Sequence, residues 1–374
     1  MNQTTLFPSP DPTIEYSNDN LIAVSTTPQK PKLWLPERVV FTPAALDEAH
    51  GQRILKRVQD LQLPVEIEKN NRLTGLRGAD ERATYNRAKR TLAVVVAPPG
   101  QFKLQPIPPS ADWQFHIAEG CPAHCQYCYL AGSLSGPPVV RAYANLDAIL
   151  DNLARFEKPN APTTYEASCY TDPLSLEHLT GSLSQAIRYF GTRQNGHLRW
   201  VSKFDAVEPL LDLEHNNQTR CRISLNAAPV SSRLEGGTAS LSNRMNALRR
   251  LALPREQGGG AYPIGVVLAP IMAMENWESH YTQLLDDLHR VLDFPTDLTW
   301  ELITHRFTPG SRDVLQSWYP KSSLDMSDEG RDIKRNKFGS EKYVYARETM
   351  KQMKGFFTRE IMSRFPNSRI LYWT

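Results

Sequence analysis

Three cysteines lie within eight residues, in the segment Gly120-Cys121-Pro-Ala-His124-Cys125-Gln-Tyr127-Cys128-Tyr129, with the spacing Cys-x3-Cys-x2-Cys. Zinc sites usually take four ligands from two cysteine or histidine pairs, and no second Cys-x2-Cys follows here. Three thiolates can instead hold three corners of a 4Fe–4S cube and leave the fourth iron open for a small molecule. Gly120 permits the tight turn that such a loop needs. The spacing therefore predicts an iron–sulfur site, with zinc as the alternative.

Three isolated side chains could also do chemistry. His124 could be mistaken for a fourth ligand, but we expect it to pack or hydrogen-bond near the cluster. Cys169 ends a predicted strand, where a lone cysteine is more often a small buried hydrophobe than a reactive thiol. Cys221 opens a predicted strand, and we assign it to the core.

From residue 112 onward, short β-rich runs alternate with amphipathic helices, which indicates parallel strands with helical crossovers. Such units form a doubly wound sheet or a barrel, complete or partial, and a barrel places its active residues at the carboxyl ends of strands. No Gly-rich phosphate motif follows the first strand, which disfavours a nucleotide fold. The predicted strands are Trp113 to Ala118, Thr164 to Tyr170, Leu198 to Phe204, Arg222 to Ala227, Ile264 to Ile271 and Leu298 to Ile303. The predicted helices are Leu146 to Phe156, Leu176 to Phe190, Met245 to Leu253 and Trp277 to Leu292.

The chain divides by composition into four parts. Residues 1–32 hold five prolines and predict a flexible tail. Residues 33–105 predict a small α/β subdomain, with strands at Val39 to Phe41, Val65 to Glu68 and Leu92 to Ala97 and a helix at Gln52 to Leu61. Residues 106–310 form the predicted barrel, and residues 311–374 a basic C-terminal extension in which the pattern loosens.

Composition and charge exclude several classes of protein. The 374 residues allow one large or two ordinary domains, and no apolar run is long enough to span a bilayer. The balance of 43 basic against 40 acidic residues gives only +3, so nucleic-acid binding must depend on local patches. Five cysteines, odd in number and clustered, with no secretory signal, predict a reducing compartment, the cytoplasm, and no membrane partner.

The chain resembles the radical S-adenosylmethionine (SAM) enzymes, of which the three-cysteine spacing is the signature, and within them the spore photoproduct lyase family. The likeness covers roughly residues 33 to 374 and rests on several motifs that occur in one order. These motifs are the cysteine loop continued to Leu130, Tyr165 to Cys169, Val201 to Phe204, Ala269-Pro270 and Glu301 to Phe307. The resemblance implies a partial (β/α)6 radical SAM barrel that uses a 4Fe–4S cluster and SAM.

The resemblance also implies an activity, the light-independent repair of a thymine dimer in which a methyl carbon of one base is joined to carbon 5 of the other. A deoxyadenosyl radical takes hydrogen from carbon 6, the inter-base bond breaks, and a cysteine thiol returns hydrogen to the thyminyl radical. Damaged DNA is the implied substrate, and an electron donor such as flavodoxin or ferredoxin the implied partner.

Family positions carry over to individual residues of this chain. Cys121, Cys125 and Cys128 match the cluster ligands, and Cys169 matches the hydrogen donor. Two tyrosines match a radical relay, and four residues match positions near the methionine part of SAM. The two tyrosines are Tyr127 and Tyr129. The four residues near SAM are Thr171, Asp172, Lys203 and Ser224.

DNA would be held through its phosphates by basic side chains, with the lesion flipped or bent toward the barrel mouth. The expected contacts follow the last barrel strand or lie in the basic extension; they are His305, Arg306, Lys334, Arg335, Lys337 and Tyr343. Lys69 to Arg90 forms a second basic region. A patch of this kind is more often a solvated face.

Three positions depart from the family pattern, and two other functions stay open. Tyr170 stands where a smaller residue such as threonine is expected and could reshape the lesion pocket. Ala123 replaces a glycine and Thr171 a serine, both mild changes. The first alternative is a radical SAM enzyme acting on another nucleic-acid lesion or a small molecule. The second is a metal-stabilised nucleic-acid-binding module without catalysis.

Overall fold

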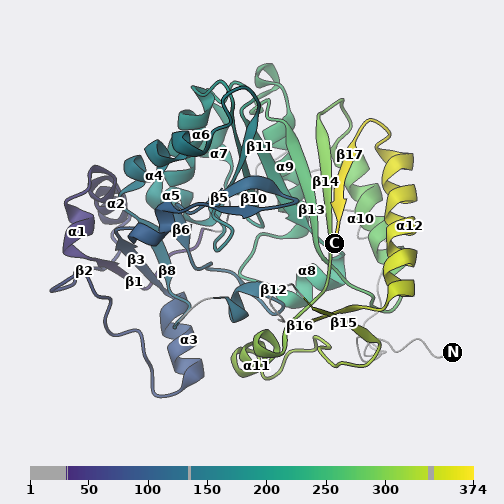
Figure 1. Ribbon diagram of the computed structural model, residues 1–374, viewed down its shortest axis with the longest axis horizontal. Helices are drawn as coiled ribbons and strands as arrows, with labels where there is room; N and C mark the ends of the chain where they lie inside the picture. Colours follow the sequence, from purple (N-terminus) through teal and green to yellow (C-terminus); the bar gives the residue numbers. More distant parts are fainter. Residues whose placement is uncertain (1–30, 32, 134–135, 336–340) are drawn as a thin grey trace.

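A curled eight-stranded sheet forms the centre of the protein in the computed structural model, which describes residues 31, 33–133, 136–335 and 341–374 (Figure 1). The strand order is β17-β14-β13-β11-β10-β9-β5-β4. Six neighbouring strands are parallel and follow one another in the chain, which confirms the partial barrel. They are β5 (Ala111–Phe115), β9 (Thr163–Ala167), β10 (Gly196–Ser202), β11 (Thr219–Leu225), β13 (Ile264–Ile271) and β14 (Leu298–Thr304). The predicted tail lies outside the described residues, apart from Pro31.

Helices cover the outer face of this sheet, because alternate strand residues are apolar there. Leu198 and Trp200 of β10 and Cys221 and Ile223 of β11 are fully buried in the main core, which confirms Cys221 as a core residue. The residues between them face the hollow of the half-barrel. The predicted helix from Leu176 breaks at Gly181, whose φ is +67°. The helices between the barrel strands are α4 (Leu146–Leu153), α5 (Glu177–Thr180), α6 (Ser182–Gly191), α7 (Glu208–Leu211), α8 (Ala228–Leu234), α9 (Leu241–Ala252) and α10 (Trp277–Val291).

Paired charges fill the hollow of the half-barrel. Arg222 of β11 forms ion pairs with Glu166 of β9 and with Glu301 of β14, the latter at 2.7 Å. Gly265 of β13 leaves room for this side chain, because a Cβ there would lie 2.9 Å from Arg222 Cγ. Tyr372 donates a hydrogen bond of 2.6 Å to Glu301 and so links the last strand to the network. Mutual pairing is what makes this burial of charge tolerable.

A smaller sheet of order β2-β1-β3-β8-β6 lies beside the half-barrel (Figure 1). The predicted subdomain strands are present, and β6 and β8, from beyond residue 105, join the same sheet. The stretch that leads into the cysteine loop is thus hydrogen-bonded to this sheet. Its elements are β1 (Arg38–Phe41), α1 (Pro43–Leu46), α2 (Ala49–Asp60), β2 (Val65–Ile67), α3 (Glu81–Lys89), β3 (Thr91–Val95), β6 (Ala118–Glu119) and β8 (Val140–Tyr143).

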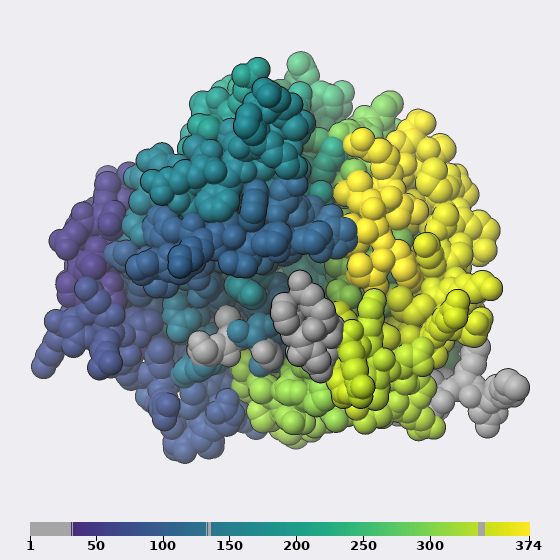
Figure 2. All heavy atoms as spheres, in the orientation of Figure 1, coloured from purple at the N-terminus to yellow at the C-terminus, as the bar shows by residue number. Residues whose placement is uncertain are grey.

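The C-terminal segment adds a strand to the barrel sheet. β17 (Arg369–Trp373) pairs in parallel with β14, and α12 (Arg347–Arg364) packs on α10 through Trp277 and Phe356, whose rings lie 4.9 Å apart. Figure 2 shows this yellow segment along one side of the molecule, opposite the purple N-terminal residues. Between β14 and α12 lie α11 (Pro309–Trp318) and a hairpin of β15 (Arg331–Arg335) and β16 (Glu341–Tyr345).

The remaining elements are short strands and single turns. The strands are β4 (Gln105–Ile107), β7 (His124–Cys125) and β12 (Glu235–Gly236), and the 3-10 turns are η1 (Pro99–Phe102), η2 (Tyr129–Gly132), η3 (Ala154–Phe156), η4 (Leu174–Leu176) and η5 (Arg255–Gln257). Of the helices that the structure describes, none has the length and apolar character to cross a bilayer.

Candidate active site

The three-cysteine loop leaves β6 through a turn that only glycine can make. Gly120 has φ +74°, and a Cβ there would lie 2.2 Å from the carbonyl oxygen of Val139. The Thr171 hydroxyl donates a hydrogen bond to the Gly120 carbonyl. Farther along, β7 pairs antiparallel with β12, with Cys125 opposite Glu235. The loop is therefore fixed at its start and at its middle cysteine.

Lys89 supports the loop from behind. Its ammonium donates hydrogen bonds to the carbonyls of Cys121 and Ala123, and the residue is only 7 % exposed. The sequence placed Lys89 in a basic surface region, and the structure places it in the interior. Its ammonium holds two backbone carbonyls of the cysteine loop, and its charge also acts on the thiols of Cys121 and Cys128.

The donor set fits a 4Fe–4S cluster. None of the three thiols is in a disulfide, and burial raises the pKa of Cys121 to about 12 and also raises the pKa of Cys125 and of Cys128. Buried thiolates are stable only beside positive charge, which bound iron supplies. Among the described residues, no three His, Cys, Asp or Glu side chains gather around the position of a single metal ion. In a cube, each thiolate binds its own iron.

His124 takes the role expected of it, that of a hydrogen-bonding loop residue. Its Nδ1 lies 2.9 Å from the hydroxyl of Tyr85, which in turn hydrogen-bonds to Tyr319. Burial lowers the pKa of His124 to about 4, so the ring is neutral near pH 7. The contact joins α3 and the end of α11 behind the cysteine loop.

Lys203 lies at the carboxyl end of β10 and faces the hollow of the barrel. Its Nζ donates to Ser224 Oγ at 2.9 Å, to Glu235 Oε1 at 2.8 Å and to the Ala269 carbonyl at 3.1 Å. The same ammonium lies 5.6 Å from the centre of the Tyr127 ring. Two of the predicted SAM-binding residues, Lys203 and Ser224, are therefore in direct contact.

Asp172 fixes the backbone that presents Lys203. Its Oδ2 accepts a hydrogen bond of 2.7 Å from the Lys203 amide, and its Oδ1 accepts one of 2.8 Å from Ser202 Oγ. Burial raises the pKa of Asp172 to about 6, and these hydrogen bonds oppose that rise. In this structure Asp172 positions the lysine, and Thr171 positions the cysteine loop.

Cys169 follows β9 in a strained turn. The preceding Ser168 has φ +56°, which is rare for a residue other than glycine and often marks a functional site. Burial raises the pKa of the Cys169 thiol, with Glu166 adding to the rise, so the sulfur keeps its hydrogen. A protonated thiol is the form that can give up a hydrogen atom.

Tyr127 and Tyr129 lie at different ends of the site. The Tyr129 hydroxyl donates a hydrogen bond to the Cys169 carbonyl, and the side chain is 62 % exposed. The Tyr127 hydroxyl donates to Glu235, beside Lys203. The pair thus extends from Cys169, the predicted hydrogen donor, to Lys203, the predicted SAM-binding lysine.

Glu235 is a central residue that the sequence reasoning missed. It is fully buried, forms ion pairs with Lys203 at 2.8 Å and Arg244 at 2.6 Å, and accepts the bond from Tyr127. Although burial alone would raise it, these two cations lower the pKa of Glu235 to about 2. No local sequence signal marked this residue, because its partners are distant in the chain.

Replacing Glu235 by glutamine should lower the free energy of unfolding by about 3–5 kcal/mol, because Lys203 and Arg244 lose a buried counter-ion. The depressed pKa means that the carboxylate contributes its full stability above its ordinary value of 4.5, and the contribution is lost as the pH falls through about 2. Urea denaturation at pH 7 measures the difference.

The matched control is Glu341→Gln, which breaks an exposed ion pair of 2.8 Å with Arg335. An exposed pair is worth at most about 1 kcal/mol. Equal losses of stability in the two variants would contradict the role given to Glu235.

Only some of the predicted DNA contacts lie together on the surface, on the hairpin of β15 and β16 and beside it. Arg306 and Lys334 are exposed, and Lys342 lies directly opposite Lys334 across the hairpin. Partial burial and the charges of Arg306 and Lys334 lower the pKa of Lys342, so the three cations lie close together. Like charges in a cross-strand pair repel unless an anion joins them. Lys342 is a further candidate that the sequence reasoning missed.

The other predicted DNA contacts are buried, are already paired with neighbouring side chains, or lie outside the described residues. His305 is 2 % exposed, and Arg331 bonds its carbonyl at 3.0 Å, so it belongs to the core. Arg335 is paired with Glu341, and the Tyr343 ring stacks on Phe307 at 5.2 Å. Lys337 lies outside the described residues.

The half-barrel and its three-thiol loop place this protein in the class of radical SAM enzymes, which hold a 4Fe–4S cluster with three cysteines. A sequence model described as spore photoproduct lyase matches residues 34–374. The chain therefore belongs to the spore photoproduct lyase family.

Relatives and solved structures are similar over almost the whole chain. A spore photoproduct lyase of Geobacillus sp. (strain Y412MC61) is 36 % identical over 92 % of this chain and 100 % of its own length, and that of Bacillus subtilis (strain 168) is 35 % identical over 91 % and 99 %. A spore photoproduct lyase mutant with bound AdoMet and dinucleoside spore photoproduct has a TM-score of 0.86 at 36 % identity, over 92 % of this chain and 100 % of that one. A complex of the enzyme with dinucleoside spore photoproduct gives the same values.

Proposed function

We propose that this protein is a DNA-repair lyase that returns spore photoproduct to two thymines. The observation that carries the proposal is the match, over 92 % of the chain, to a structure with bound AdoMet and dinucleoside spore photoproduct. The relatives favour neither of the two alternatives, another radical SAM reaction or a non-catalytic module. The substrate is accordingly damaged DNA, and the cofactors are a 4Fe–4S cluster and SAM.

The cysteines and Lys203 have the chemistry to hold these cofactors. Cys121, Cys125 and Cys128 would each bind one iron of the cluster. Bound together, cluster and SAM supply the electron transfer and the deoxyadenosyl radical that takes hydrogen from carbon 6 of the lesion. Lys203 and Ser224, which contact each other at 2.9 Å, would offer an ammonium to the carboxylate of SAM and a hydroxyl to its amino group.

Cys169 returns the hydrogen. Loss of hydrogen at carbon 6 lets the bond between the methylene and carbon 5 break, which restores one thymine and leaves a methylene radical on the other. The Cys169 S–H bond breaks, its hydrogen completes the methyl group, and the sulfur keeps the unpaired electron. The thiyl radical of Cys169 would regain a hydrogen atom from 5′-deoxyadenosine through Tyr129, which contacts the Cys169 backbone, and Tyr127, beside Lys203. The unpaired electron would thereby return to the deoxyadenosyl group, from which SAM can be regenerated.

We place the DNA backbone on a basic surface made by Arg306, Lys334 and Lys342. The exposure of Arg306 and Lys334 and the like-charge pairing of Lys334 with Lys342 support this placement. Phosphates between the two lysines would relieve their repulsion. Tyr343 and Arg335 support the hairpin that carries them.

The triple variant Arg306→Ala, Lys334→Ala and Lys342→Ala should bind lesion-containing DNA more weakly and with a shallower salt dependence. Each lost phosphate contact removes about 0.9 from the slope of log affinity against log salt, so the slope should fall by up to about 3. Binding titrations between low and high salt measure it.

Arg335→Ala serves as the control, because Glu341 already neutralises this arginine. In Arg335→Ala, the slope of log affinity against log salt should change less than in Lys334→Ala or Lys342→Ala. A triple variant with the slope of the unchanged protein would show that the DNA lies elsewhere.

The electron donor and the location follow from the same chemistry. We propose that a small carrier such as flavodoxin or ferredoxin reduces the cluster, and that the enzyme works in the cytoplasm. All five cysteines lie outside disulfides, which suits a reducing compartment.

The experiment that tests the function is an anaerobic assay with reduced protein, SAM and dinucleotide spore photoproduct. Chromatography should show the lesion converted to two thymines. Cleavage of SAM without any loss of the lesion would favour another substrate, and absence of SAM cleavage would remove the enzymatic proposal altogether.

A further inference from the structure

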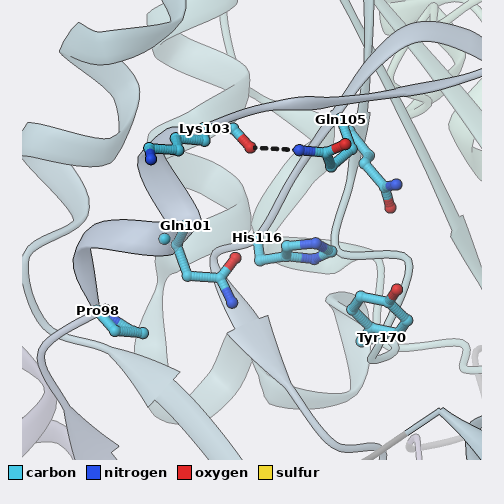
Figure 3. Close-up of a pocket in the computed structure, with 8 residues that line it drawn as sticks. Pro98, Gln101, Lys103, Gln105, His116 and Tyr170 are labelled. Atoms are coloured by element: carbon cyan, nitrogen blue, oxygen red, sulfur yellow. Dashed lines mark hydrogen bonds between the residues drawn. The ribbon is translucent and has the colours of Figure 1, made fainter.

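A pocket of about 270 Å³ lies beside the loop that carries Cys169 (Figure 3). None of the residues proposed above for catalysis, cofactor binding or DNA contact lines it. Its inner wall is formed by Gln114 and His116, which belong to β5 and the residue after it, and by Tyr170. Its exposed rim carries Lys103 and Gln105, with Gln101 between rim and wall. The volume suits a group the size of one nucleobase rather than a whole drug-sized ligand.

The pocket is rigidly coupled to Cys169. Tyr170 is the next residue in the chain, and Ser168, on the other side of the cysteine, is tied to the strand that carries His116. The Ser168 amide donates to the Phe115 carbonyl at 2.7 Å, and the Ile117 amide donates to Ser168 Oγ at 3.0 Å. A ligand in the pocket is thus held in a fixed place relative to the donor thiol.

The inner wall carries two aromatic rings. The rings of His116 and Tyr170 are stacked, with centroids 4.9 Å apart and planes inclined by 25°. Figure 3 shows the Gln101 side chain extending toward these two rings. Stacking on aromatic rings is how proteins commonly hold an unpaired base.

Three polar atoms of the lining residues have no hydrogen-bond partner among the residues that the structure describes. His116 is only 8 % exposed, and its Nδ1 is buried without a hydrogen-bond partner among the described residues. The amide nitrogens of Gln101 and Gln105 bond Glu119 at 2.5 Å and the Lys103 carbonyl at 3.3 Å. In the described part of the chain neither amide oxygen accepts a hydrogen bond, so both can receive a donor from a base edge.

We propose that this pocket binds the base of a nucleotide that flanks the lesion, stacked on the His116–Tyr170 pair with its phosphate toward Lys103. The inference rests on the proposed repair of DNA, and it adds a contact beyond the two joined thymines. The wall carries no full charge, which suits a neutral base, whereas the single cation lies at the exposed rim, where a phosphate would be. Tyr170 supplies one of the two rings of this stack, at a position where the family resemblance implies a smaller residue.

The test compares three lesion substrates with the cluster-loaded protein in the absence of reductant. They are the lesion dinucleotide, a tetranucleotide with one ordinary nucleotide on each side of the lesion, and the same tetranucleotide with abasic flanks. The base-bearing tetranucleotide should bind about 5- to 100-fold more tightly than the abasic one, the range expected from stacking one base. In Tyr170→Ala and Tyr170→Thr this ratio should fall close to one, whereas Tyr170→Phe should keep most of it.

Equal binding of base-bearing and abasic tetranucleotides by the unchanged protein would overturn the proposal. So would a ratio that survives in both Tyr170→Ala and Tyr170→Thr. Repair of the dinucleotide, measured on the same preparations, separates this outcome from a failure of the function itself. Repair without a preference for flanking bases refutes only the pocket, while absence of repair by the unchanged protein refutes the lyase.

Discussion

Replacing Cys125 by alanine should remove the cluster and with it all SAM cleavage and repair. Cys125 is buried in β7, opposite Glu235 of β12, so no water or neighbouring side chain can easily take the place of its sulfur. A cube held by two thiolates instead of three loses both a ligand and its fixed orientation. Iron and sulfide content, the brown absorbance and the electron-paramagnetic signal after anaerobic reconstitution measure the loss.

Cys221→Ala is the matched control for this variant. Cys221 is equally a buried cysteine, but it lies within β11 and packs in the main core. Its removal costs packing energy and should leave iron content and colour intact. If Cys125→Ala kept a full complement of iron, the assignment of the cluster ligands would be wrong.

Replacing Cys169 by alanine should leave the cluster and SAM cleavage intact but prevent clean return to two thymines. The lesion would still lose its inter-base bond, since that step needs only hydrogen abstraction at carbon 6. The methylene radical would then find no S–H bond beside it and would give other products. Chromatography of the nucleoside products, together with measurement of 5′-deoxyadenosine, separates the two steps.

Cys169→Ser refines the test, because it keeps the size and polarity of the side chain while its O–H bond is too strong to give up hydrogen readily. It should therefore behave like the alanine variant, and Cys221→Ala like the unchanged protein. Normal thymine yield without by-products in Cys169→Ala would remove the donor assignment. It would leave the assignment of the cluster ligands standing.

The sequence alone predicted parallel strands with helical crossovers, and the family resemblance favoured a half-barrel over a doubly wound sheet. Strand and helix periodicity are local properties of the chain, and the six alternating units each bury one apolar face, so their order predicts parallel strands. The three cysteines of the predicted cluster site could also be recognised from the sequence, because all three lie in one loop. Cys169 and Lys203 were placed correctly at carboxyl ends of strands, since β9 ends at Ala167 and β10 at Ser202.

Exposure could not be predicted from charge. Lys89 lies in a stretch of basic residues that looks solvated, yet it is buried beneath the cysteine loop and holds two of its carbonyls. His305 follows the last barrel strand and is buried against Arg331. Each is interior because of what covers it, and the covering elements lie far away in the chain.

Tertiary structure decided how the parts of the site meet. Glu235 contacts Lys203, Arg244 and Tyr127 only because β12 pairs with β7 of the cysteine loop. β17 joins the barrel sheet beside β14, although α11 and α12 lie between the two strands in the chain. The pairing of His116 with Tyr170 depends likewise on β5 lying beside β9. Periodicity and motifs report interactions between near neighbours in sequence, whereas these contacts arise from the packing of distant segments, which no local pattern encodes.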